Sequence, residues 1–419
     1  MSTYLDSALS ASFRRRVQTV GGVDIVVGVP AYKNSRTISE VIHTVAAGLH
    51  THFPGVRSAI VVADGGATDE TLKLSHTASL APGVKLLVSD YVGLTGKGSA
   101  VRGILEASEV LEASACAIVD ADLRTITPQW VERLVAPILR DEADFVTPYY
   151  TRDRHEVTIN DLITYPFTRG LYGRGVRHPL GAEMAMGPRA WKAFIARDVW
   201  ETDVARFGIH IWMVTQAVNS GWRLAQAALG TKTHDYKDPT VGFEPKFMQI
   251  IGTMFRLMSI YRRVWPEVHG AEEVPVYGEV KRVEADPVPA TRQSLWDGFT
   301  KGFKRYRRNL QAILDPAQFD LVRDLASGEA TEWPAGAWAR TVMDFAVVYN
   351  RGEGDPDKVA LSLLPLYYAR KAMLLRELEG QLWSKVEDSV QAEADSFIQA
   401  KRYLVDRWES YLPWQGAGR

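Results

Sequence analysis

The chain has 419 residues, which exceeds the usual domain size of about 100–150 residues and therefore indicates two packed units. Hydrophobic residues make up 46% of it and charged residues 24%, which is typical of a globular protein and excludes a disordered one. The 49 Lys and Arg residues nearly balance the 50 Asp and Glu residues, so we expect no nucleic-acid partner that is bound through a general positive field.

The single cysteine, Cys116, excludes a disulfide within the chain and any metal site built from several thiolates. It lies in the apolar run 115–119, which predicts a buried structural residue. No run of about 18 uncharged apolar residues is present to span a membrane, and no hydrophobic run follows Arg14–Arg16 as in a secretory signal. We therefore expect a soluble, cytoplasmic protein.

The first half of the chain alternates apolar runs of strand length with segments of helical period. The apolar runs predict strands that are covered on both faces of a sheet, and they span residues 24–29, 58–62, 84–88 and 115–119. Between the first two runs, apolar residues recur at helical spacing from Ile38 to Leu49. The alternation predicts an α/β fold with a mostly parallel, Rossmann-like sheet, whose ligands bind beyond the carboxyl ends of the strands.

The second half of the chain has a helical pattern with few turn signals. One apolar face runs from Trp338 to Tyr349 and another from Leu361 to Leu382, and residues 352–356 break the chain between them. The Val-, Pro- and Glu-rich segment 272–289 is predicted to be a linker or surface excursion. We therefore predict an α/β domain over residues 1–240 and a mostly helical domain over 241–419.

The sequence Asp120-Ala121-Asp122 ends the fourth predicted strand and places two carboxylates close together at the edge of the sheet. Two hard oxygen donors at this spacing suit a divalent cation that is shared with a diphosphate. A solvated pair that caps the next segment is the alternative. A metal site here needs a third ligand, and His234 is a candidate, although a lone histidine among polar residues is usually only solvated.

Two further motifs follow predicted strands. The loop 64–69, Asp-Gly-Gly-Ala-Thr-Asp, suits contact with the base or ribose of a nucleotide, or it is only a well-capped loop before a helix. Gly96-Lys97-Gly98 opens the next helical segment, where a lysine can reach phosphate oxygens. The full phosphate-binding pattern Gly-x-x-x-x-Gly-Lys-Ser/Thr is absent.

The order of these motifs resembles that of nucleotide-sugar glycosyltransferases of the GT-A fold. More narrowly, the chain is similar to the mannosylglycerate, glucosylglycerate and glucosyl-3-phosphoglycerate synthases, which are retaining enzymes. The motifs that carry the resemblance are Pro30-Ala31-Tyr32, the loop 64–69, Gly96-Lys97-Gly98, Asp120-Ala121-Asp122, Pro179-Leu180-Gly181-Ala182-Glu183 and His234.

The resemblance implies roles for these residues. Asp122 and His234 would bind Mg²⁺ or Mn²⁺, Asp120 would contact the ribose or the metal, and Lys97 would neutralise the diphosphate. The nucleotide would also meet Asp64, Ala121 and the segment Pro30, Ala31 and Tyr32. The acceptor carboxylate would meet Arg152 and Thr164, Glu183 would hold sugar hydroxyls, and the anomeric centre and acceptor would be shaped by Leu180, Gly181 and Ala182.

The chain departs from the family pattern at two places. Lys33-Asn34-Ser35 follows the first strand, where relatives often carry an acidic residue. His210 stands where relatives carry a carboxylate, and it is either a catalytic residue or a polar residue on a helix face.

The resemblance implies a metal-dependent hexosyltransferase. Such an enzyme would move glucose or mannose from a UDP- or GDP-linked donor to D-glycerate and so make a compatible solute. The alternatives are 3-phosphoglycerate as the acceptor, another family 2-like glycosyltransferase, and a degenerate, non-catalytic scaffold. We expect the helical half to contribute to the acceptor pocket or to a dimer or tetramer interface.

Overall fold

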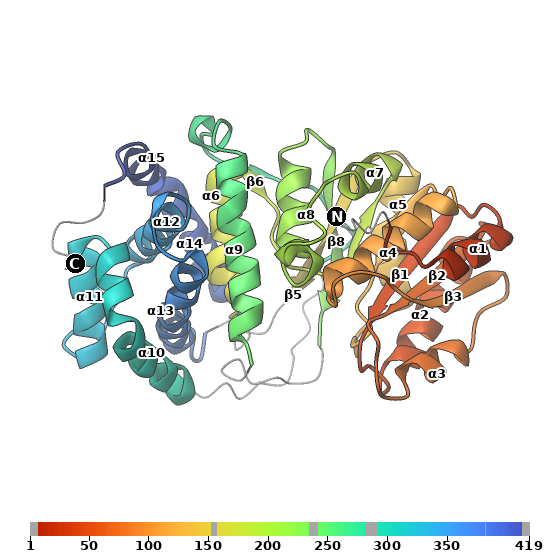
Figure 1. Cartoon of the computed structure of the whole chain (residues 1–419), viewed down its shortest axis with the longest axis horizontal. Helices are drawn as coiled ribbons and strands as arrows, with labels where there is room; N and C mark the ends of the chain where they lie inside the picture. Colours follow the sequence, from red (N-terminus) through yellow and green to blue (C-terminus); the bar gives the residue numbers. More distant parts are fainter. Residues whose placement is uncertain (1–6, 152–156, 234–241, 281–291, 382, 413–419) are drawn as a thin grey trace, which may run out of the picture. The chain divides into compact units, whose positions relative to one another are not determined.

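The computed structural model describes residues 7–151, 157–233, 242–280, 292–381 and 383–412. The chain divides into two compact units (Figure 1). Unit 1 comprises Met1–Arg152, Leu180–Asp235 and Val274–Val283, and unit 2 comprises the remaining segments, Asp153–Pro179, Tyr236–Glu273 and Glu284–Arg419. The division differs from a single boundary at residue 240, because the segment 153–179 belongs to unit 2 and the segment 274–283 to unit 1.

Unit 1 is built on an eight-stranded sheet with the strand order β10-β8-β5-β7-β4-β1-β2-β3. Only β7 is antiparallel to its neighbours, β4 and β5, and every other pairing is parallel. The predicted α/β class is therefore confirmed. The strands are β1 (Ile25–Ala31), β2 (Ser58–Asp64), β3 (Val84–Asp90), β4 (Ala115–Ile118), β5 (Phe145–Thr151), β7 (Met184–Met186), β8 (Leu224–Thr231) and β10 (Val276–Tyr277).

Strand β10 adds a short edge strand that the sequence analysis did not predict. Its two residues lie in the segment 272–289, which was predicted to be a linker or surface excursion, and they pair with Gln226 and Ala227 of β8 at the edge of the sheet. A strand of two residues shows no alternation of apolar and polar side chains, so periodicity could not reveal it.

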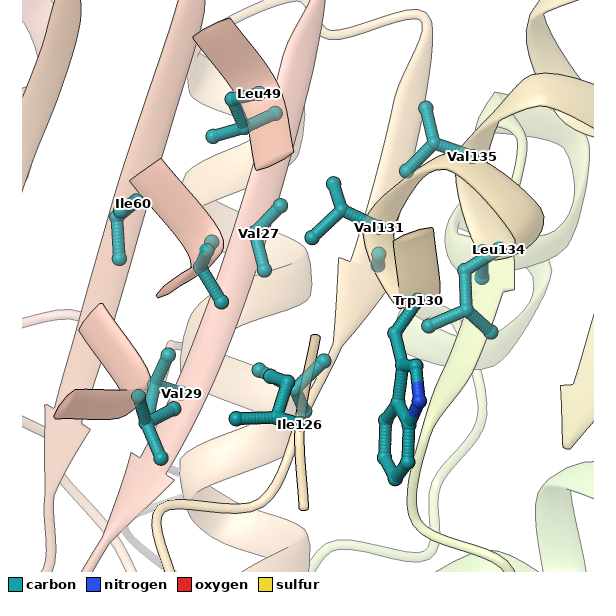
Figure 2. Packing of buried hydrophobic residues seen from close by; sticks show 14 of the residues in the cluster. Val27, Val29, Leu49, Ile60, Ile126, Trp130, Val131, Leu134 and Val135 are labelled. Carbon is teal, nitrogen blue, oxygen red and sulfur yellow. The ribbon is translucent and has the colours of Figure 1, made fainter. Parts of the chain in front are cut away.

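Helices cover both faces of this sheet. One face packs against α2 (Ile38–His52) and α5 (Pro128–Leu139), where Val27, Val29 and Ile60 meet Leu49 and the row from Trp130 to Val135 (Figure 2). On the other face, α4 (Lys97–Val110) lies so close to β1 that a Cβ on Gly28 would collide with Ile104. The other helices of unit 1 are α1 (Ala11–Val20), α3 (Thr71–His76), α7 (Pro188–Ile195), η2 (Asp203–Ala205) and α8 (Ile209–Val218).

The cysteine lies within this sheet, as predicted. Cys116 is in the middle strand β4 and is fully buried. Burial raises the pKa of its thiol to about 12. The thiolate that reacts or binds metal is therefore disfavoured, and Cys116 is a packing residue.

Unit 2 is mostly helical, which confirms the prediction for the second half of the chain. The predicted break is present, since α12 ends at Arg351 and α13 begins at Pro356, but α13 ends at Glu377 and Leu382 lies outside the described residues. The elements are η1 (Asn160–Thr164), α6 (Tyr165–Tyr172), β6 (Arg174–Gly175), α9 (Glu244–Ile260), η3 (Trp265–Glu267), β9 (Glu272–Glu273), α10 (Arg292–Ile313), α11 (Pro316–Ser327), α12 (Ala335–Arg351), α13 (Pro356–Glu377), α14 (Trp383–Gln399) and α15 (Lys401–Glu409).

Two glycines allow α10 to pack tightly along α13. A Cβ on Gly298 would lie 2.9 Å from the ring of Tyr368, and a Cβ on Gly302 would collide with Pro365. Helix α10 also carries four exposed basic side chains, namely Lys301, Lys304, Arg305 and Arg308. Among the described residues, no helix combines the length and apolarity that crossing a bilayer requires.

A buried carboxylic acid in unit 2 makes stability depend on pH. Asp344 is fully buried on α12 and accepts hydrogen bonds from Tyr403 Oη (2.5 Å) and the backbone N–H of Asp315 (3.0 Å). Burial raises its pKa from the ordinary value of 3.8 to about 7, and the hydrogen bond from Tyr403 opposes the rise only in part. The folded chain therefore keeps this proton over a pH range in which the unfolded chain has released it.

We expect the free energy of unfolding to fall as the pH rises from about 4 to about 7, and the Asp344→Asn variant to lose this part of the pH dependence. Urea unfolding at several pH values measures both. The exposed Asp320, 56% accessible, provides the control, because Asp320→Asn should keep the wild-type slope. An unchanged slope in Asp344→Asn would contradict the assignment.

Candidate active site

Five polar side chains of unit 1 meet at the carboxyl edge of the central strands. Asp120 follows β4, Lys232 follows β8, Tyr150 lies in β5, Glu183 directly precedes β7, and Lys97 is the first residue of α4. Parallel strands end at the same edge of a sheet, which is how residues 135 positions apart in the chain come together here. We refer to these five residues as the charged cluster.

Lys232 is the centre of the charged cluster. Its ammonium nitrogen lies 2.9 Å from Asp120 Oδ2 and 3.0 and 2.9 Å from the two oxygens of Glu183. The Lys97 ammonium binds the other oxygen of Asp120, Oδ1. Glu183 also accepts hydrogen bonds from Tyr150 Oη and from the backbone N–H of Asp120, the latter at 3.2 Å. Two carboxylates and two ammonium groups are thus joined in one network.

Exposure increases outward through the charged cluster. The side chain of Glu183 is 0% exposed, that of Lys232 is 8%, that of Asp120 is 14% and that of Lys97 is 19%. Burial opposes ionisation of Asp120, but the charges of Lys232 and Lys97 outweigh burial and hold its pKa well below the ordinary value. Burial raises the pKa of Glu183, with Lys232 opposing the rise. The surroundings thus shift the pKa values of the two carboxylates in opposite directions, and Lys97 is the more exposed of the two lysines.

The glycines beside Lys97 serve packing. A Cβ on Gly98 would collide with the carbonyl of Val204, and the Gly98 N–H already donates to the carbonyl oxygen of Arg206 (3.1 Å). This amide at the start of α4 is therefore not available to a phosphate. The positive charge at the start of α4 is therefore that of the Lys97 side chain, the group that the sequence indicated for phosphate contact.

The loop after Asp122 lies next to the residue that precedes His234. The Arg124 N–H donates to the carbonyl of Thr233 (3.1 Å), and the Thr233 N–H donates to Thr125 Oγ1 (3.0 Å). His234 itself lies outside the described residues. The two expected metal ligands are therefore adjacent in sequence to segments that the structure joins.

Asp120 is a poor ligand for a divalent cation, which leaves Asp122 as the carboxylate that is expected to bind one. Both oxygens of Asp120 are hydrogen-bonded to ammonium groups, which repel a cation and compete with it. Among the described residues, no three His, Cys, Asp or Glu side chains gather as a metal site. Completion of such a site around Asp122 thus requires a residue outside that set, such as His234.

The predicted nucleotide-contacting segments meet at the ends of β1 and β2. Asp64 is 3% exposed, and its Oδ2 accepts from the N–H groups of Gly66 (3.0 Å) and Ala67 (2.9 Å). A Cβ on Gly65 would lie 3.2 Å from the Tyr32 ring, which is 52% exposed. The structure therefore uses Asp64 to shape its own loop and presents the Tyr32 ring to solvent. Pro30 and Ala31 are buried in β1, and the Ala121 carbonyl accepts from Thr37 Oγ1 (2.7 Å).

Of the remaining predicted residues, some belong to unit 1 and one to unit 2. Leu180, Gly181 and Ala182 directly precede Glu183 in unit 1, and His210 is buried in the first turn of α8. Thr164 is fully buried in unit 2, where its hydroxyl donates to Asn160 Oδ1 (3.5 Å). Arg152 lies outside the described residues.

Lys232 and Tyr150 were not predicted from the sequence. A single lysine after an apolar strand looks like any solvated lysine, and a tyrosine within a strand looks like core. The available signal was position, since Lys232 follows a strand end and stands two residues before His234.

A mostly parallel sheet with helices on both faces and a charged cluster at its carboxyl edge fits the predicted GT-A fold. Residues 26–190, which include β2 to β5, nearly all of β1 and every residue of the charged cluster except Lys232, match the family model Glycosyl transferase family 2. The match covers less than half of the chain and is to a glycosyltransferase domain, and the protein is a glycosyltransferase enzyme.

Solved structures of glucosyl-3-phosphoglycerate synthase from Mycobacterium tuberculosis are similar to this chain. The complex with Mn²⁺, UDP and phosphoglyceric acid has 21% identity and a TM-score of 0.44, over 61% of this chain and 84% of that one. The complex with Mg²⁺ and UDP has 22% identity and a TM-score of 0.43, over 60% and 83%. A comparison with curated protein sequences finds no match.

Proposed function

We propose that the protein transfers a hexose from a nucleoside diphosphate hexose to the hydroxyl of D-glycerate, with Mg²⁺ or Mn²⁺ as cofactor and with retention of the anomeric configuration. The observation that carries the donor part is Lys97, an ammonium group at the outer side of the charged cluster and at the sheet edge where ligands bind. A departing nucleoside diphosphate carries the largest charge that develops in such a transfer, and a fixed cation stabilises it.

The reaction balances without a protein nucleophile. The bond between the anomeric carbon and the diphosphate oxygen breaks, and its electron pair stays on the diphosphate. The acceptor oxygen bonds to the same face of the anomeric carbon, and its proton passes to the departing phosphate oxygen. Glu183 is not placed to attack, because it is fully buried and both its oxygens accept hydrogen bonds within the charged cluster.

The divalent cation would be held by Asp122 and His234. When bound, it would supply a second positive charge for the diphosphate. Asp120 is assigned to the ammonium groups that surround it, and not to the metal. A sugar hydroxyl could reach Glu183 only by displacing Lys232, Tyr150 or the Asp120 N–H, so we assign Glu183 to positioning within the charged cluster.

The acceptor assignment rests on the similarity of the Arg152 and Thr164 segments to those of mannosylglycerate synthase. An arginine can form a bidentate pair with the glycerate carboxylate. Two further roles of unit 2 stay predictions: that it completes the acceptor pocket, or that it forms a dimer or tetramer interface. Measurement of the mass of the protein in solution tests the second.

A matrix of donors against acceptors tests the proposed function. UDP-glucose, GDP-glucose and GDP-mannose are each combined with D-glycerate, 3-phosphoglycerate and D-lactate, and release of the nucleoside diphosphate is measured with Mn²⁺ and with EDTA. We expect release that depends on both D-glycerate and Mn²⁺, and an α-linked product by NMR. Preference for 3-phosphoglycerate would reassign the acceptor, a β-linked product would exclude retention, and no acceptor-dependent release would contradict the proposed function.

A further inference from the structure

The coordination of Lys232 separates its role from that of Lys97. A lysine ammonium has three N–H donors and no acceptor. Three carboxylate oxygens surround that of Lys232 at 2.9 to 3.0 Å, one from Asp120 and two from Glu183. All its donors are therefore accounted for, and its side chain is only 8% exposed. Lys97 is more exposed and reaches Asp120 alone among the hydrogen bonds described for it.

We propose that Lys232 is a positioning residue of the donor site, which fixes Asp120 and thereby keeps Lys97 directed towards the diphosphate. The inference rests on the proposed function, because it presumes a diphosphate ligand. Asp120 presents one oxygen to each lysine, so Lys232 holds the carboxylate in place when Lys97 exchanges Asp120 for a phosphate oxygen. Glu183 holds Lys232 from the buried side with both its oxygens.

Further contacts hold the pair of Lys232 and Glu183 in place. Tyr150 Oη donates to Glu183, and the Lys232 ammonium lies 5.5 Å from the centre of the Tyr150 ring, a favourable place for a cation. The Asp120 backbone N–H donates to the same Glu183 carboxylate. Main chain and side chain of Asp120 are thus tied to one buried pair, which restricts Asp120 to a single orientation.

A double-mutant cycle tests whether Lys232 acts through Asp120. Affinity for UDP and for GDP is measured by calorimetry, in EDTA and in Mn²⁺, for the wild type, Lys232→Met, Asp120→Asn and the double variant. Lys232→Met should weaken nucleoside diphosphate binding about tenfold, which corresponds to about 1.4 kcal/mol. In the Asp120→Asn background the same substitution should change affinity by less than about threefold, because the group it positions is gone.

Other outcomes overturn the proposal in distinguishable ways. An equal loss in both backgrounds would mean that Lys232 contacts the diphosphate itself. A lower melting temperature with unchanged affinity in Lys232→Met would mean that the residue only stabilises the fold. Lys232→Arg should restore most of the affinity, since a guanidinium can bridge both carboxylates, and Lys192→Met, an exposed lysine of α7, should behave as the wild type. If the wild type binds neither nucleotide, the proposed function fails before Lys232 is tested.

Discussion

Replacing Lys97 with methionine is expected to lower kcat/KM for glycosyl transfer by about 10²–10³-fold, the usual effect of removing one group that stabilises charge in a transition state. Lys97 is the most exposed cation of the charged cluster, and the Gly98 N–H at the start of its helix is already bonded to Arg206, so the side chain supplies the positive charge at this point. Steady-state release of the nucleoside diphosphate at varied donor concentration measures the loss.

Two variants sharpen the Lys97 result. Lys97→Arg keeps the charge and should retain more activity than Lys97→Met, although its planar fork does not reproduce the geometry of an ammonium group. Lys73→Met removes a lysine whose side chain is 74% exposed and should leave the rate unchanged. If Lys97→Met stays within about threefold of the wild type, Lys97 does not stabilise the leaving group.

Replacing Asp122 with alanine is expected to raise the Mn²⁺ concentration for half-maximal activity by about 100-fold or more, since even groups that only orient metal ligands contribute 10–100-fold to metal affinity. Asp122 is the carboxylate of the pair that is not the shared partner of Lys97 and Lys232, and the structure joins the segment after it to Thr233. Titration of activity with Mn²⁺ measures the shift.

Asp122→Ala and Asp120→Asn should differ in their effect on the Mn²⁺ requirement. Asp120→Asn should keep a Mn²⁺ requirement close to that of the wild type, because Asp120 is assigned to the two lysines. Glu70→Ala, an exposed carboxylate at 64% accessibility, controls for a general loss of negative charge. An unaltered Mn²⁺ requirement in Asp122→Ala would remove this residue from the metal site.

The sheet was predictable because its strands are buried on both faces. All residues of β1, β2 and β4 are buried, so the sequence shows continuous apolar runs there, and Asp64 and Asp120 mark the ends of the runs of β2 and β4. The assignment of residues 153–179 to unit 2 was not predictable in this way. It depends on contacts with helices more than 200 positions later, such as Arg177 with Glu387, and a local pattern carries no information about them.

The location of the candidate site was predictable from the sequence, but its hydrogen bonds and ion pairs were not. A strand end identified Asp120, the start of a helical segment identified Lys97, and the family resemblance identified Glu183. The structure joins all three in one network with Lys232. The expected part of Glu183 in sugar binding presumed an accessible carboxylate, and exposure cannot be read from a Pro-Leu-Gly-Ala-Glu motif. Whether Glu183 is open to a substrate or paired with a lysine depends on which side chain packs beside it. That side chain, Lys232, follows a different strand and is distant in the sequence.

A crystal structure with Mn²⁺ and the bound nucleoside diphosphate, located by the anomalous signal of manganese, tests the central claim most directly. The account predicts manganese bonded to the Asp122 carboxylate and the His234 imidazole, a diphosphate oxygen within hydrogen-bonding distance of Lys97 Nζ, and Lys232 still on Asp120 and Glu183. Manganese and diphosphate bound away from Asp122 and Lys97 would contradict it.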